Sequence, residues 1–165
     1  MNKADIVQAL QVAQEIDRRN NYGHVLPIAA FDDTVQRGQD KYAELKQALD
    51  AYNASQPSNK RYRDAGLDHY AHRYTTYLAS QQGPLLGTMM LVAAAAKEIP
   101  DFVKYAIKDG VRSSWNESGK DLTEDWHGYK MGMNSSVAPE QNPDFNKYNG
   151  GTVRFVLNNL IKEQK

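Results

Sequence analysis

Residues 67–98 constrain the fold of this chain more than any other stretch, because they join two different kinds of helix through Gly83-Pro84. The first half is dense in ionisable and aromatic side chains, whereas the run from Leu85 to Ala96 is the most apolar in the chain. Glycine often closes a helix and proline often begins the next, so this pair predicts a turn between two helices. A helix that is apolar nearly all round is usually surrounded by others, which predicts a central position for the second one.

Length and composition favour one water-soluble domain. The chain has 165 residues and no cysteine, which excludes disulfides, a thiolate nucleophile and cysteine-based metal sites. Twenty basic residues balance 20 acidic ones, and no basic run indicates nucleic-acid binding. The longest apolar run is too short to cross a membrane, and the N-terminus lacks a signal-peptide pattern. We therefore expect a soluble protein without a transmembrane segment, either cytoplasmic or packaged in a particle.

Helical spacing of apolar residues recurs along the chain, and no strand-like alternation stands out. It predicts helices over about 3–19, 34–52, 67–79, 84–96, 122–133 and 152–161. Four features are expected to interrupt them: an extended segment at 24–33, a break or a new helix start at Pro100, a polar turn at 116–120 and a long irregular loop at 134–151.

The expected fold class is all-α, a compact multi-helix bundle with a central apolar helix. We expect a single domain over residues 1–165. Within it, residues 1–60 supply N-terminal helices and the extended segment, residues 61–134 the core, and residues 135–165 a loop and a docking helix.

The candidate site is a set of three carboxylates and one histidine: Asp68, His72, Glu98 and Asp125. Asp68 and His72 are four residues apart, and a carboxylate that orients an imidazole is what a general base needs. Asp125 shares a helix face with Gly128 and Gly132, which would let another backbone come close. A carboxylate held between helices must be paired. The set is either catalytic or a structural polar network, and the absence of a nucleophile motif and of HExxH favours the structural interpretation.

No metal or cofactor site is expected. His69 and His72 could form a metal pair, but they lie about 60° apart around a helix, and His69 is expected to point outward. His127 is interpreted as a surface histidine. Tyr70, Tyr74 and Tyr77 fit a core stripe better than a stacking surface, and Gly-rich phosphate loops are absent.

The order of these residues resembles serum amyloid A. The likeness lies in Asp68-x-Tyr70-x-His72, Tyr77-x-Ala79, Gly83-Pro84, a small-residue helix ending in Lys97-Glu98, and Asp125 followed by Gly132. The chain is also similar to a bacterial and phage domain with the signature Arg-His-Ala-Tyr-Trp, a later Ala-His-Glu and Asp-x-x-Asn-Asn-x-x-Gly. Both likenesses cover about residues 61–134.

This resemblance implies an all-helical bundle in which Asp, His, Glu and Asp side chains converge, with His72, Glu98 and Asp125 in the signature positions. The chain departs from the bacterial signature at several places. Ala71 stands in place of its arginine, Thr75 in place of its tryptophan, and Gly128 and Tyr129 in place of its paired asparagines.

Together these features favour a soluble helical interaction or structural protein with protein partners, such as a bacterial or phage accessory or virion component. A hydrolase of cell-envelope or lipid material is an alternative, with His72 as the base and Asp68 orienting it. A carrier of lipid or another hydrophobic ligand is a third, because serum amyloid A is a lipid-associated protein. Whether the chain is an enzyme, and its oligomeric state, are left open.

Overall fold

The computed structural model describes residues 28–64, 66–109 and 111–161, and this part of the chain is helical without strands. The α-helices are α2 (Ile28–Ala54), α3 (Leu67–Gln81), α4 (Pro84–Asp109), α5 (Val111–Met133), α6 (Pro143–Lys147) and α7 (Gly151–Phe155). Two 3-10 turns, η1 (Ser58–Lys60) and η2 (Pro139–Gln141), and a π-helical turn, η3 (Val156–Ile161), complete them. The predicted all-α fold class is confirmed, whereas the predicted helix over 3–19 lies outside the described residues.

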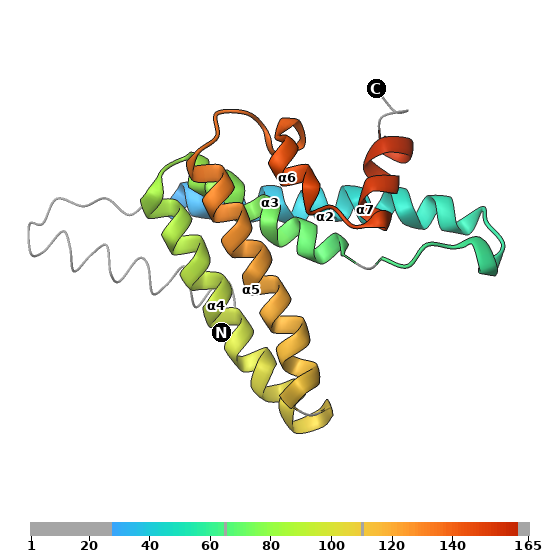
Figure 1. Ribbon diagram of the computed structural model, residues 1–165, viewed down its shortest axis with the longest axis horizontal. Coiled ribbons are helices and arrows are strands. Elements are labelled where there is room, and N and C mark those ends of the chain that lie inside the picture. Colours follow the sequence, from blue (N-terminus) through green and yellow to red (C-terminus); the bar gives the residue numbers. More distant parts are fainter. Residues whose placement is uncertain (1–27, 65, 110, 162–165) are drawn as a thin grey trace, which may run out of the picture.

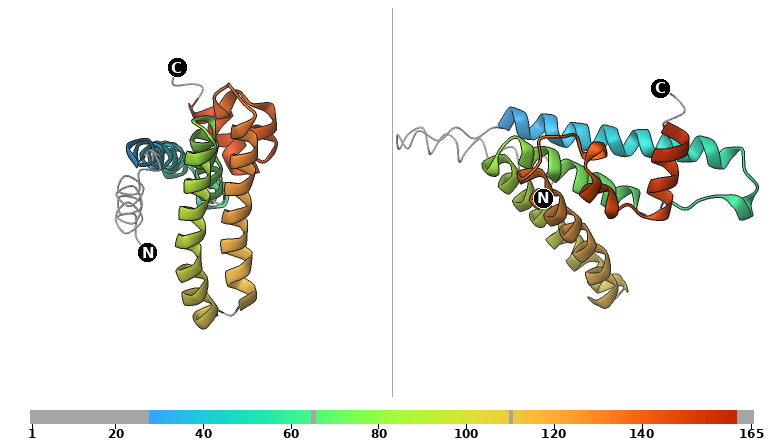
Figure 2. Two further views of the ribbon diagram at one scale, coloured as in Figure 1. Left: turned by 90° about the vertical axis from the view of Figure 1, so that its left-hand side faces the viewer. Right: turned by 45° about the horizontal axis from the view of Figure 1, so that its top comes forward.

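α3 is the helix around which the others pack, since it contacts α2, α4 and α5. In Figure 1, α2 runs alongside α3, while α4 and α5 leave the body together as a projecting hairpin. The side view in Figure 2 shows these two helices next to each other along their length. The C-terminal elements return to the body: α6 contacts α5, α7 contacts α3 and η3 contacts α2. None of the described helices is long and apolar enough to cross a membrane.

Two apolar clusters form the core, and α3 contributes to both. The larger cluster joins α2, α3 and the C-terminal elements through Leu45, Leu49, Leu67, Tyr70, Tyr77, Phe145, Val153 and Val156. The smaller joins α2, α3 and α4 through Phe31, Ala79, Leu86, Met89, Met90 and Ala93. The apolar run of α4 therefore reaches the core, although Leu85 and Val92 on the same helix are exposed.

The start of α2 corrects the expected extended segment. Residues 28–33 are helical, and residues 24–27 lie outside the described part of the chain. Thr34 lies inside this helix, where its hydroxyl donates a 2.7 Å hydrogen bond to the Ala30 carbonyl. Gly38 lets α2 approach α3 closely, because a Cβ there would lie 1.9 Å from Thr75 Oγ1.

The α4–α5 hairpin corrects two more expectations. α4 continues through Pro100 to Asp109, and α5 already begins at Val111, so neither the break at Pro100 nor the turn at 116–120 is present. The two helices pack against each other, and such tertiary contacts override weak local preferences.

The stretch from 134 to 151 is also more regular than predicted, because it contains η2 and α6. The Asn142 side chain caps α6 by accepting hydrogen bonds from the backbone N–H groups of Asp144 and Phe145, at 2.9 and 3.3 Å. Pro143 occupies the first helical position, where its missing N–H costs nothing. Phe145 is fully buried, so this short helix anchors the segment to the core.

Candidate functional site

Two glycines bring the backbone of α5 directly onto α3. A Cβ at Gly128 would lie 2.2 Å from the Arg73 carbonyl oxygen, and a Cβ at Gly132 would lie 2.3 Å from the Tyr77 carbonyl oxygen. Only glycine fits at such distances. The predicted close approach of another backbone is therefore found, and we call this contact the α3–α5 junction.

Asp125 lies about one turn before Gly128 and is 1% exposed. Its Oδ2 is 3.1 Å from His72 Nδ1, and the His72 side chain is 19% exposed. A hydrogen bond in this direction places the histidine proton on Nδ1 and orients the ring. The buried carboxylate is thus paired, as its position between helices requires.

Asp68 lies near the start of α3, whereas Asp125 is buried on α5. Asp68 is exposed in the first turn of α3, where one of its oxygens, a nitrogen of His69 and an oxygen of Asp121 lie within 4.8 Å of one another. His69 Nε2 is 3.4 Å from Asp121 Oδ1, so His69 faces α5 and the expectation that it points outward is wrong. The physical reason is that α3 is covered on several sides, and His69 lies on the side that meets α5. Glu98 belongs to α4, and its side chain lies outside the described residues.

Arg73 is the site residue that the sequence interpretation missed. It is 1% exposed, and its guanidinium donates hydrogen bonds to the Glu124 carboxylate on α5 and, over 2.6 Å, to Asn149 Oδ1 beyond α6. A buried charge is tolerated only with such partners. The sequence did contain one indication that Arg73 is buried. Tyr70, Arg73 and Tyr77 recur at intervals of three and four residues and so lie on one face of the helix.

Aromatic rings complete the surroundings of this arginine. The guanidinium carbon lies 4.7 Å from the centroid of Phe145 and 5.6 Å from that of Tyr148. Arginine stacks favourably on aromatic faces, most strongly when both are shielded from water. Arg73 thereby connects α3 to α5 through its ion pair with Glu124. It connects α3 to the C-terminal segment through the Asn149 side-chain amide and the rings of Phe145 and Tyr148.

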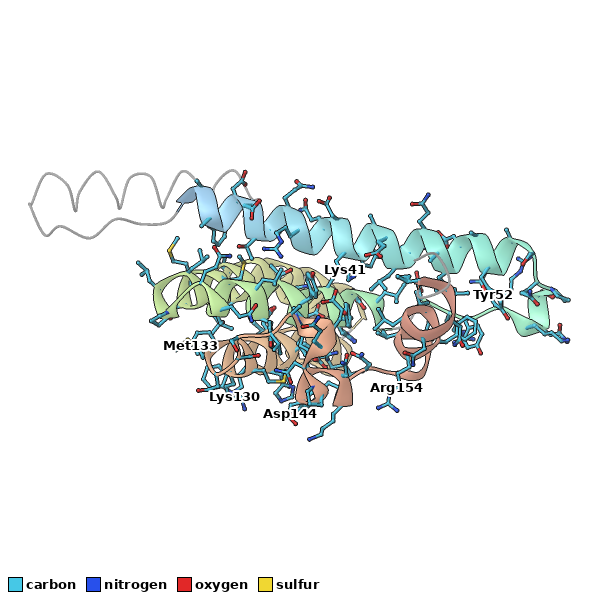
Figure 3. The ribbon with its side chains drawn as sticks, turned by 90° about the horizontal axis from the view of Figure 1, so that it is seen from above. Lys41, Tyr52, Lys130, Met133, Asp144 and Arg154 are labelled. Carbon is cyan, nitrogen blue, oxygen red and sulfur yellow. The ribbon has the colours of Figure 1, made fainter. Side chains whose placement is uncertain are left out.

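A pocket of about 300 Å³ opens beside the junction, between α5 and α6. It is lined by His127, Lys130, Met131, Asp144, Lys147 and Tyr148. Figure 3 shows Lys130 and Asp144 on the side of the molecule away from α2. Asp68, His72 and Asp125 are not among these lining residues, so the pocket does not serve the predicted constellation.

His127 is half-buried in this pocket wall, not fully on the surface. Its ring centroid lies 4.3 Å from that of Tyr148, and its Nδ1 is buried with no hydrogen-bond partner among the residues described. Burial lowers the pKa of His127, and the nearby Glu124 carboxylate opposes this only in part. The ring is therefore neutral at pH 7.

Three ion pairs between described residues cross from α3 to α5: His69–Asp121, His72–Asp125 and Arg73–Glu124. Each joins a cationic or potentially cationic group on α3 to a carboxylate on α5. The arrangement can hold the two helices in register. It also contains a histidine whose Nδ1 is bound by a carboxylate, which is the geometry of a general base.

Comparison with known proteins gives no match to a family model, to a curated protein or to a solved structure. The resemblance to serum amyloid A and to the bacterial and phage domain therefore stays a prediction.

Proposed function

We propose that this chain is a non-enzymatic structural or interaction protein in which the α3–α5 junction fixes the fold. The observation that carries the proposal is that the buried charged side chains at this junction are paired. Asp125 and Arg73 are both 1% exposed, and each is bonded to a partner on another element. A carboxylate enclosed in this way is not accessible to a substrate, whereas its pairing offsets the free-energy cost of its burial.

An interaction role also requires a surface, and the projecting hairpin supplies one. Among the described residues, its large exposed apolar side chains are Leu85 and Val92 on α4 and Leu122, Trp126 and Met133 on α5. Large exposed apolar side chains on a projecting element favour protein contacts. We take the partner to be a second copy of this chain, because two hairpins placed side by side form a four-helix bundle, which buries an apolar stripe on each helix.

A hydrolase is the second candidate, and one observation favours it. The His72 ring is partly exposed, and its Nδ1 is bound by a carboxylate, so its Nε2 could act as a base. In that case the orienting residue is Asp125, and not Asp68 as the sequence suggested.

Stability distinguishes these two functions. If the junction is structural, His72→Ala and Asp125→Asn should each lower the free energy of unfolding by about 1–3 kcal/mol or more, because a buried partner is left unsatisfied. Catalytic groups are commonly held at a cost to stability, so their removal would leave the free energy unchanged or raise it. Urea denaturation measures the difference, and Asp144→Asn is the control, since this exposed carboxylate pairs only with Lys147 among the ion pairs described.

The hairpin surface is tested by the oligomeric state. Size-exclusion chromatography with light scattering should show self-association of the wild-type chain and its loss in the double variant Val92→Ser, Trp126→Ser. Val137→Ser, an exposed apolar residue outside the hairpin, should behave as wild type. A monomeric wild-type chain that binds lipid vesicles through Trp126 would contradict the proposal and support the lipid carrier instead.

A further inference from the structure

We propose that Asp68, His69 and Asp121 form a binding site for a divalent transition-metal ion, with Zn²⁺ as the best fit. The inference goes beyond the structural role of the junction and does not depend on it. It rests on the spacing of three donor atoms, on their chemical type and on the two helices that supply them.

The spacing matches a metal site better than a hydrogen bond. Zinc binds imidazole nitrogen and carboxylate oxygen at about 2.0–2.2 Å, so two ligands of a tetrahedral ion lie about 3.4 Å apart. His69 Nε2 and Asp121 Oδ1 are 3.4 Å apart. This is longer than the usual N–H···O distance of about 2.7–3.2 Å, within which the neighbouring His72–Asp125 pair falls at 3.1 Å.

The third donor is close enough to join them. One ligand atom from each of Asp68, His69 and Asp121 lies within 4.8 Å of the other two. Asp68 is exposed, so an ion can reach its carboxylate from solvent. Three protein ligands leave one tetrahedral position for water.

The donor set selects the kind of ion. One imidazole and two carboxylates suit zinc and its neighbours in the first transition row, and zinc binds such sites more tightly than Mn²⁺. Ca²⁺ prefers six to eight oxygens, and Mg²⁺ prefers an octahedral oxygen shell, so a site with an imidazole disfavours both. The two carboxylates also balance the double positive charge of the ion.

The site lies at the surface end of the junction and joins its two helices. Asp68 and His69 come from the first turn of α3, and Asp121 comes from α5. The side chains of His69 and Asp121 are 29% and 17% exposed, so an ion can enter from solvent. A bound ion would tie α3 to α5 beside the His72–Asp125 pair, and an ion that binds only the folded chain stabilises it.

A simpler interpretation is that Asp68 only stabilises the N-terminal end of α3, where negative charge is favourable. The two interpretations differ in their response to metal. A helix-end role needs no ion, whereas a metal site makes the melting temperature depend on zinc.

The test is calorimetric titration of the full, chelator-treated chain with ZnCl₂ alone, together with thermal denaturation with and without the ion. We expect saturable binding of one zinc per chain, a rise in melting temperature, and no competition from Mg²⁺ or Ca²⁺. Asp68→Asn and His69→Gln should each weaken the affinity at least about tenfold, since even indirect support of a ligand is worth about 10–100-fold. Co²⁺ in place of zinc should give the visible absorption of a tetrahedral site.

Two matched controls make the result specific. Asp144→Asn and His127→Gln remove a carboxylate and a histidine elsewhere and should leave the zinc affinity unchanged. The exposed Asp68 is the decisive position, because its amide variant should keep the wild-type circular dichroism spectrum. Absence of saturable zinc binding, or binding that Asp68→Asn and His69→Gln do not weaken, overturns the proposal. The stability test of His72→Ala, made in chelator, is independent of this outcome.

Discussion

The side chain of Tyr70 buries a polar hydroxyl group in the core of the protein. Its side chain is 1% exposed, and its hydroxyl has no hydrogen-bond partner in the part of the chain that the structure describes. Burial raises the pKa of this hydroxyl far above its usual range, so it stays protonated and must be buried as an O–H group. An unsatisfied buried group of this kind costs about 1–3 kcal/mol.

We therefore expect Tyr70→Phe to raise the free energy of unfolding by about 1 kcal/mol, as measured by urea denaturation. Tyr77→Phe is the matched control. The Tyr77 hydroxyl lies 2.5 Å from Ser135 Oγ and 3.0 Å from the Val137 carbonyl, so its removal should lower the free energy by about 1 kcal/mol. Equal losses in both variants would contradict the account of Tyr70.

His127 makes stability depend on pH. Its folded pKa is lowered by burial from the ordinary 6.5, so the unfolded chain binds the proton more readily. The stabilising contribution of the neutral ring is therefore complete above pH 6.5 and is lost as the pH falls toward the folded pKa. Urea denaturation at pH 7.5 and 5.5 should show a smaller loss for His127→Gln than for the wild-type chain. The same loss in both would mean that this ring does not titrate as proposed.

Among the helices, the contact between α3 and α5 is sensitive to added volume because the atoms that an added Cβ would meet include backbone. A Cβ at Gly128 would lie 2.2 Å from both the Arg73 carbonyl oxygen and Thr76 Oγ1. Gly128→Ala must push the two helices apart, and overpacking of this kind costs about 1–3 kcal/mol or more. Thermal or urea denaturation checks this loss.

Gly151→Ala is the control for this substitution. A Cβ there would meet nothing within 4 Å, and the residue lies in the first turn of α7. Its free energy of unfolding should therefore be unchanged or higher by up to about 1 kcal/mol. A Gly128→Ala chain as stable as Gly151→Ala would rule out the tight contact.

The elements that could be predicted are those specified by the backbone preferences of a few residues close together in the sequence. Gly83-Pro84 ends one helix and begins the next because both residues have strong backbone preferences, and the turn lies where they place it. The pair Gly128 and Gly132 predicted a close backbone contact for the same reason. The predicted break at Pro100 was wrong. Whether a proline breaks a helix depends on what packs against that helix, and the packing partner is distant in the sequence.

The site could be predicted only in part. Asp125 was placed between helices by its glycine neighbours, but its partner across the contact could not be read from spacing within one helix. Arg73 was missed because a charged residue on a core face is usually interpreted as exposed. Its partners Glu124 and Asn149 lie 51 and 76 residues away, and only the tertiary fold brings them to it.

Across the whole molecule, Arg73 joins α3 to both α5 and the C-terminal segment. Arg73→Ala leaves Glu124 and Asn149 without this donor, and breaking a buried ion pair costs about 3–5 kcal/mol. We expect a loss of about 3 kcal/mol or more in urea denaturation. Arg154→Ala is the control, because that arginine is exposed and donates only to the Lys147 carbonyl among the bonds described (Figure 3). Similar losses in the two variants would show that burial of the arginine is not what matters.

The fold class of the whole molecule followed from helical periodicity and from the lack of alternation, which are properties of composition and order. Its function did not follow, because a buried polar network and an active site use the same residue types. The distinction depends on which atoms reach solvent. Hardly any atoms of Asp125 and Arg73 reach solvent, since each residue is 1% exposed.

The hairpin of α4 and α5 has a mechanical consequence. At about 1.5 Å per residue, α5 is roughly 34 Å long, and the close contacts that Gly128 and Gly132 make with α3 lie in its second half. Because Gly128 and Gly132 hold its base against α3, a force on the hairpin would turn it about the body as a lever. A load applied at its far end is therefore multiplied at the base, where the ion pairs between α3 and α5 would be the first bonds to feel the torque.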